Sequence, residues 1–207
     1  MKKLLITALL SLPVLALAGP VSANELLTNG SFESDLQAAN SWKIYKQLTG
    51  WSAGALGVEL RDDVVGQAMD GLNFVELDTT GNSSISQSIA TVIGQTYHLS
   101  FAYAQREGTA AATNGMSWSA GNMSDIAFGA DGNTGWTLMN TSFMAVDTLT
   151  TLTFQALGTS DSFGTSLDAV SVTQAVPEPA SLLLVMSGLA VCLMASRGRR
   201  LAPVAIR

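Results

Sequence analysis

The segment Thr96-Tyr97-His98-Leu99-Ser100-Phe101-Ala102-Tyr103-Ala104 decides how this chain folds. Its large apolar side chains recur at every second position, at Tyr97, Leu99, Phe101 and Tyr103, with small or polar residues between them. Because successive side chains of a β-strand point to opposite faces, this alternation predicts a strand with one buried face.

Shorter runs of the same kind fill the chain from residue 24 to residue 175, separated by residues typical of turns. No stretch of this region sustains a helical period. Strands are expected at 42–45, from 50, at 57–61, 73–78, 84–90, within 116–128, at 136–144, 149–156 and 167–172, with a turn and a short strand at 28–33. Turns are expected at 70–71 and 131–133. Roughly nine to eleven short strands at even spacing predict an all-β antiparallel sandwich.

The N-terminus has the layout of an export signal. A basic start precedes an apolar run at 4–17 and the small residues Val21-Ser22-Ala23. We expect a signal peptide over residues 1–23, with Ala16-Leu17-Ala18 as an alternative cleavage site. A permanent N-terminal anchor is disfavoured by Pro13 and by the shortness of the run.

The C-terminus carries a second apolar segment. Val176-Pro177-Glu178-Pro179 precedes an uncharged run at 180–195, and three arginines follow at 197–200. As a helix the run would span about 24 Å, less than a hydrocarbon core of about 30 Å. The arginines would hold its end, with the tail 201–207, on the cytoplasmic side. This layout favours a sorting signal over the alternative of an ordinary single-span anchor.

These C-terminal features resemble the PEP-CTERM sorting signal of Gram-negative bacteria. The residues that carry the resemblance are Pro177, Glu178, Pro179, Arg197, Arg199 and Arg200. It covers residues 176–200 and implies recognition and cleavage by an exosortase-type membrane protease. The helix would then be a transient membrane segment, in the inner membrane during transit, and the mature protein would reach the cell surface or the extracellular matrix.

The region 24–175 is strongly acidic. It holds 15 acidic and four basic residues, a net charge of −11 that the basic termini reduce to −6 for the whole chain. Such a domain repels phosphate backbones, so we expect no nucleic-acid binding. The only cysteine, Cys192, lies in the C-terminal apolar run, so the exported domain folds without a disulfide.

The domain as a whole resembles galactose-binding-like jelly rolls, which include many carbohydrate-binding modules. The segments that carry this resemblance are 27–33, 50–51, 57–60, 70–78, 94–101 and 167–172. It implies a jelly-roll β-sandwich over residues 24–175 and an association with extracellular polysaccharide, as in a biofilm matrix. It also implies one structural Ca²⁺ held by Glu33 and Asp168, although Ala169 stands where relatives often carry a second polar residue.

Carbohydrate binding needs aromatic platforms and polar groups that bond hydroxyls. The candidate platforms are Trp42, Tyr45, Trp118 and Trp136, and the candidate polar partners are Glu59, Arg61, Glu76 and Arg106. The alternative is that two or more tryptophans fill the core, with Trp51 the foremost candidate.

We expect a protein that is not an enzyme. His98 is the only histidine, and neither a Gly-x-Ser-x-Gly elbow nor a zinc-binding Cys/His set occurs. The resemblance places Glu59 near Glu76, so a paired-carboxylate glycoside hydrolase is a disfavoured alternative. A structural surface protein without a small ligand is the main rival to a glycan-binding protein.

Overall fold

The computed structural model describes residues 24–128, 135–175, 187–190 and 192–193. Ala23–Ala175 form one compact unit, and the two ends of the chain form another, in which residues 187–190 and 192–193 are helical. None of the described helical residues belongs to a helix long and apolar enough to cross a membrane. Several predictions lie outside the described residues. They are the signal peptide, the residues at 177–179 and 197–200 that carry the sorting resemblance, most of the helix expected at 180–195, the tail 201–207 and the turn at 131–133.

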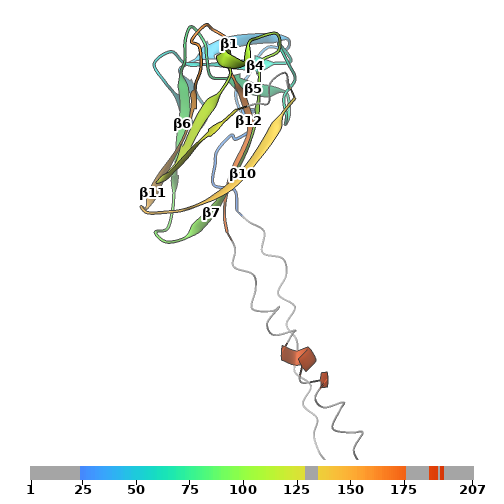
Figure 1. Ribbon diagram of the computed structural model, residues 1–207, viewed down its shortest axis with the longest axis vertical. Helices are drawn as coiled ribbons and strands as arrows, with labels where there is room; N and C mark the ends of the chain where they lie inside the picture. Colours follow the sequence, from blue (N-terminus) through green and yellow to red (C-terminus); the bar gives the residue numbers. More distant parts are fainter. Residues whose placement is uncertain (1–23, 129–134, 176–186, 191, 194–207) are drawn as a thin grey trace, which may run out of the picture. The chain divides into compact units, whose positions relative to one another are not determined.

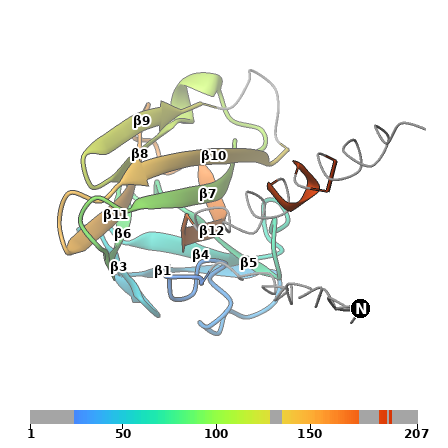
Figure 2. The ribbon, with the colours of Figure 1, turned by 90° about the horizontal axis from the view of Figure 1, so that it is seen from below.

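The described part of residues 24–175 is a sandwich of two antiparallel six-stranded sheets, with one 3-10 turn, η1 (Ala111–Thr113) (Figures 1 and 2). Sheet A has the order β1 (Ser41–Tyr45), β4 (Val58–Asp62), β5 (Asn73–Glu76), β12 (Ser166–Gln174), β7 (Thr96–Ala104) and β10 (Thr137–Met144). Sheet B has the order β2 (Gln47–Leu48), β3 (Trp51–Ala53), β6 (Ser84–Ala90), β11 (Leu149–Ala156), β8 (Met116–Ala120) and β9 (Met123–Ala127). The prediction of an antiparallel jelly-roll sandwich is confirmed.

The core lies between the two sheets and contains the alternating residues of the deciding strand. Tyr97, Leu99, Phe101 and Tyr103 of β7 are all buried in it, as predicted. The ring of Phe101 meets that of Phe154 from the opposite sheet edge-on, with centroids 4.9 Å apart. Such interlocking of aromatic side chains fixes how the sheets stack.

Two tryptophans fill this core. Trp51 is 2 % exposed, which confirms its expected place. Trp118 is 3 % exposed and its ring lies 6.0 Å from that of Phe101. Since Met116 and Ala120 are also buried, β8 turns every second side chain inward, Trp118 among them. The prediction of Trp118 as a platform for a ligand is therefore wrong.

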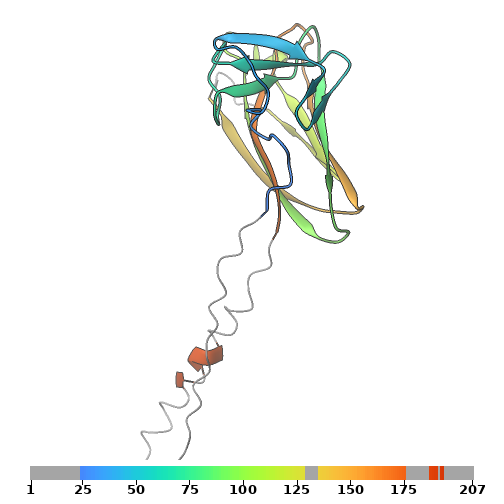
Figure 3. The same ribbon diagram turned by 180° about the vertical axis from the view of Figure 1, so that it is seen from behind.

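The segment 28–33 forms a turn, and the short strand predicted there is absent from the described structure. Asn29 and Phe32 have positive φ angles of 58° and 60°, which no strand accommodates, and the Asn29 side chain accepts a hydrogen bond from the Ser34 N–H. The turn nonetheless lies against the last strand, because the Val170 N–H donates to the Gly30 carbonyl over 3.0 Å. Figure 3 shows this N-terminal segment running beside β12.

Candidate functional site

The outer face of sheet A collects most of the predicted ligand-binding residues. Strand pairing places Ile44, Glu59, Glu76, Ser166 and Ala104 in one row across β1, β4, β5, β12 and β7. A second row begins with Trp42, Arg61 and Phe74. Directly paired residues share a face of a sheet, and the intervening Leu60 and Val75 belong to the core, so both rows face outward.

Four charged side chains on this face form an ion-pair network. Arg61 Nη2 lies 2.6 Å from Glu59 Oε2 and 3.1 Å from Glu76 Oε2. Arg106, from the loop after β7, contributes Nη1 at 2.7 Å from Glu76 Oε1. Two carboxylates thus balance two guanidinium groups. We call Glu59, Arg61, Glu76 and Arg106 the charge cluster.

The charge cluster is buried although it lies outside the main core. The side chains of Glu76 and Arg61 are 0 % and 1 % exposed, and that of Arg106 is 15 % exposed. Burial raises the pKa of Glu76 to about 7, against the opposing effect of the positive charges of Arg61 and Arg106. Arg61 Nη1 is buried and has no hydrogen-bond partner among the described residues. The charge cluster therefore contains one buried guanidinium nitrogen whose N–H groups have no acceptor among the described residues.

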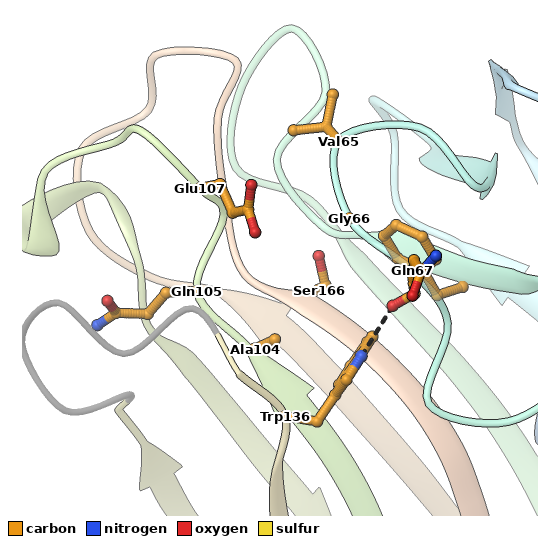
Figure 4. A pocket seen from close by; sticks show the side chains of 9 residues that line it. Val65, Gly66, Gln67, Ala104, Gln105, Glu107, Trp136 and Ser166 are labelled. Carbon is orange, nitrogen blue, oxygen red and sulfur yellow. Dashed lines mark hydrogen bonds between the residues drawn. The ribbon is translucent and has the colours of Figure 1, made fainter.

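A first hollow lies over this face, beside Trp136 (Figure 4). Its volume is about 340 Å³, and Val65, Phe74 and Glu107 are among its lining residues. The Trp136 ring meets the Phe74 ring edge-on at 5.8 Å, and its Nε1 donates to the Gln67 carbonyl over 2.8 Å. These two contacts hold the indole in place.

Two further hollows continue the first. One of about 380 Å³ shares Val65 and Glu107 with it, and one of about 300 Å³ shares Arg106 and Phe163 with that second hollow. Trp42 and Phe163, at the third hollow, are 51 % and 42 % exposed. The Arg106 guanidinium lies 4.5 Å from the centre of the Phe163 ring. We call the three adjoining hollows the outer groove.

The structure thus brings together most of the predicted ligand-binding residues. Of the predicted ligand-binding residues, Trp42, Glu59, Arg61, Arg106 and Trp136 line the outer groove, and Glu76 joins them through the charge cluster. Tyr45 is a correction, because it pairs with Val58 and packs against the core. Arg61 and Arg106, on the outer face of sheet A, supply the positive charges that balance Glu59 and Glu76.

Val65, Glu107 and Phe163 are among the lining residues that the sequence did not predict. Val65 and Glu107 carry no pattern that marks them. Phe163 does carry a signal, because it is a lone aromatic residue in the polar loop Ser160-Asp161-Ser162-Phe163-Gly164. An aromatic side chain in such a loop is poorly placed to join a core and is free to line a binding surface.

The two predicted calcium ligands, Glu33 and Asp168, accept hydrogen bonds from the same short segment, residues 69–73. Glu33 Oε1 accepts hydrogen bonds from the N–H groups of Leu72 and Asn73, and Asp168 Oδ2 accepts from those of Met69 and Asp70. Asp168 is fully buried, and burial raises its pKa to about 7, with a further rise from the Asp70 carboxylate.

A cation would suit this buried carboxylate chemically, since oxygen ligands are those that Ca²⁺ takes. However, no group of three or more His, Cys, Asp or Glu side chains within the described ranges is arranged to hold a metal ion. Backbone carbonyls would have to supply the remaining ligands. The calcium site stays a prediction.

The fold defines a class of protein, the antiparallel jelly-roll β-sandwich, and several solved structures are similar to it. The arabinose-bound MgGH51 α-L-arabinofuranosidase matches with a TM-score of 0.51 at 14% identity, over 74% of this chain and 27% of that one. TmCBM61 in complex with β-1,4-galactotriose matches with a TM-score of 0.44 at 15% identity, over 74% and 100% of the chains. A family 16 carbohydrate-binding module matches with a TM-score of 0.48 at 16% identity, over 71% and 98%. At these identities the likeness concerns the fold.

The chain belongs to the DUF642 family, described as a protein of unknown function, whose model matches residues 25–173. The PEP-CTERM protein-sorting motif matches residues 175–200, which confirms the resemblance found at the C-terminus. A search of curated proteins finds no match.

Proposed function

We propose that the protein is an exported, non-enzymatic surface or matrix protein that binds an extracellular polysaccharide in the outer groove. The sorting motif supports the export, and the fold is one that carbohydrate-binding modules share. The observation that carries the proposal is the groove itself, with the rings of Trp42, Trp136 and Phe163 beside the buried charge cluster.

The groove supplies the two kinds of contact that a sugar chain needs. Aromatic rings stack on the C–H faces of sugar rings, and fixed polar groups bond the hydroxyls. Arg106 lines two of the hollows with a side chain that is 15 % exposed, and its guanidinium is held by the ion pair with Glu76. Because Glu76 already holds Arg106 in place, a sugar hydroxyl that bonds its free N–H groups would cost little ordering of the protein.

The charge balance favours a neutral glycan. The charge cluster cancels internally, and Glu107 and Asp161 at the second hollow add negative charge to a domain of net charge −11. A polyanionic chain would be repelled over this surface unless cations accompanied it.

The charge cluster also argues against hydrolysis. A glycoside hydrolase needs one carboxyl group to protonate the leaving oxygen and a second to act as base or nucleophile. Here Glu59 and Glu76 both ion-pair with Arg61, and the Glu76 carboxylate is held by Arg106 as well. Two carboxylates so engaged support a binding role.

Removal of the C-terminal signal completes the proposed route. An exosortase-type membrane protease would cut near residues 176–179 and release the domain to the surface or matrix. The intact mass of the protein recovered from the culture medium tests this step. A species ending near the prolines supports it, and a full-length chain found only in membranes contradicts it.

The binding proposal is tested by calorimetric titration of the protein with neutral and uronic-acid polysaccharides. Trp42→Ala and Trp136→Ala should each weaken binding at least tenfold. Phe128→Ala is the matched control, because Phe128 is 60 % exposed but lines none of the three hollows. If no glycan binds, the rival function, a structural surface protein without a small ligand, takes the place of this one.

A further inference from the structure

One end of the sandwich carries a cluster of exposed apolar side chains. Val92 and Ile93, between β6 and β7, are 58 % and 61 % exposed. Met144, Val146 and Leu149, at and between the ends of β10 and β11, are 53 %, 53 % and 59 % exposed. We call these five residues the apolar tip. Figure 1 shows both connections at the same end of the sandwich.

Hydrogen bonds join the two connections into one surface. The Thr91 N–H donates to the Thr148 carbonyl over 2.9 Å, and the Gly94 N–H donates to the Ala145 carbonyl over 2.8 Å. The Tyr97 hydroxyl also accepts a bond from the Val92 N–H. These bonds hold the two connections next to each other at one end of the sandwich, where their apolar side chains are exposed.

The tip carries little charge. Asp147 is the one charged residue in segments 91–97 and 144–150, and its carboxylate accepts a hydrogen bond from the Thr148 N–H. Contiguous apolar side chains on a surface mark a contact with another apolar phase or partner. The low charge means that burying this end would remove few charged groups from water.

The path of the chain beyond the sandwich points to a lipid bilayer as the apolar phase. Ala175 is the last residue of the sandwich, and its N–H donates to the Thr96 carbonyl, two residues beyond Gly94. Only residues 176–179 then separate it from the apolar run at 180–195. Fully extended, this connection spans about 17 Å at most, from roughly 3.4 Å per residue.

We propose that the apolar tip rests in the surface of the lipid bilayer while the C-terminal segment is still attached. This inference rests on the proposed function in one respect, that the 180–195 run occupies the membrane before cleavage. A chain so tethered presents to the bilayer the end from which it leaves the domain, and that end is the apolar one. The opposite end, which carries the loop with Arg106, is directed away from the lipid.

The test uses the full chain in vesicles of phosphatidylethanolamine and phosphatidylglycerol. Cys192→Ala removes the only cysteine, and Ile93→Cys then takes an environment-sensitive fluorophore. Ala55→Cys is the matched control. Ala55 is exposed and follows Gly54, whose N–H bonds the Ser84 carbonyl at the far end of β6 from the tip. The seven residues of β6 separate the two sites by about 20 Å.

We expect brominated lipids to quench the probe at position 93 at least threefold more than the probe at position 55, with little dependence on salt. Val146→Ser with Leu149→Ser should lower the quenching at position 93, because these residues share the same tip. Equal quenching at both sites, in chains that float with the vesicles, overturns the proposal.

Two other outcomes are distinguishable. Chains that fail to float with vesicles refute the membrane segment itself, and with it the sorting part of the proposed function. Shielding of position 93 that grows with protein concentration in lipid-free detergent points to a second copy as the occupant and overturns the lipid assignment.

Discussion

Arg61→Met is the substitution that tests the charge cluster most directly. It keeps much of the side-chain volume but removes the guanidinium that bonds Glu59 and Glu76. Both carboxylates would then share the single remaining cation, Arg106, in a site where Glu76 has no exposed surface. Breaking a buried pair by removing one partner costs about 3–5 kcal/mol. In a domain of this size each kcal/mol lowers Tm by about 2–4 °C, so we expect a fall of about 6–20 °C at neutral pH.

The pH dependence gives the sharper test. Glu76 already has its pKa raised from 4.5 to about 7, and loss of Arg61 raises it further. The folded state then keeps a proton that the unfolded chain releases above about pH 4.5. The free energy of unfolding of the variant should therefore fall as the pH rises from about 4.5 through 7, and the deficit relative to wild type should be smallest near pH 5.

The assay is urea denaturation of wild type and variant at pH 5 and pH 8, followed by tryptophan fluorescence. A second variant, Arg61→Met with Glu59→Gln and Glu76→Gln, removes the carboxylates as well and should recover much of the loss at pH 8. A loss below about 1 kcal/mol at pH 8, or one that is the same at both pH values, would refute the reasoning.

Four further predictions concern other parts of the domain. Gly30→Ala should destabilise by about 2 kcal/mol or more in denaturant titrations, because its Cβ would lie 1.9 Å from the Val170 carbonyl oxygen; an unchanged midpoint contradicts the close approach. Asp168→Asn should flatten the decline of stability from about pH 4 to pH 7, since the native carboxyl has its pKa raised from 3.8 to about 7; an unchanged slope tells against burial as the cause. Calcium should raise the Tm of the wild type and leave that of Asp168→Asn unchanged; a chelator without effect on the wild type removes the predicted metal. Phe163→Ala should weaken glycan binding without changing Tm by more than a few degrees, since Phe163 is 42 % exposed; unchanged affinity excludes it from the groove.

The strands were predictable where alternation continued over seven residues or more. β6, β7 and β11 begin and end at the predicted residues, because each has one face in the core and one turned outward. At 28–33 the turn was predicted correctly, but the short strand expected beside it is absent, because Asn29 and Phe32 have positive φ angles and Asn29 is bonded both to nearby residues and to a distant one. Asn29 Nδ2, for example, donates to the Thr49 carbonyl.

The sequence predicted which residue types form the candidate site, but it predicted only in part which face of its sheet each residue occupies. Glu59 and Glu76 were expected to be neighbours, and the register pairs them. Tyr45 and Trp118 were assigned outward, yet each stands at the inward parity of its strand. An aromatic residue suits a core and a binding surface equally well, so its face follows from the register of its strand, which pairing with distant segments determines.

The position of β12 bears on the order of events in export. This strand is the last to be synthesised, yet it lies in the middle of sheet A, paired with β5 on one side and β7 on the other. Without Ser166–Gln174, strands β1, β4 and β5 are not joined to strands β7 and β10, and sheet A is not continuous. Sheet A can therefore be completed only when nearly the whole domain is available. If the protein is exported as we propose, a chain that still lacks β12 has not closed its sandwich, and the domain would complete its fold only after Ser166–Gln174 has crossed the membrane.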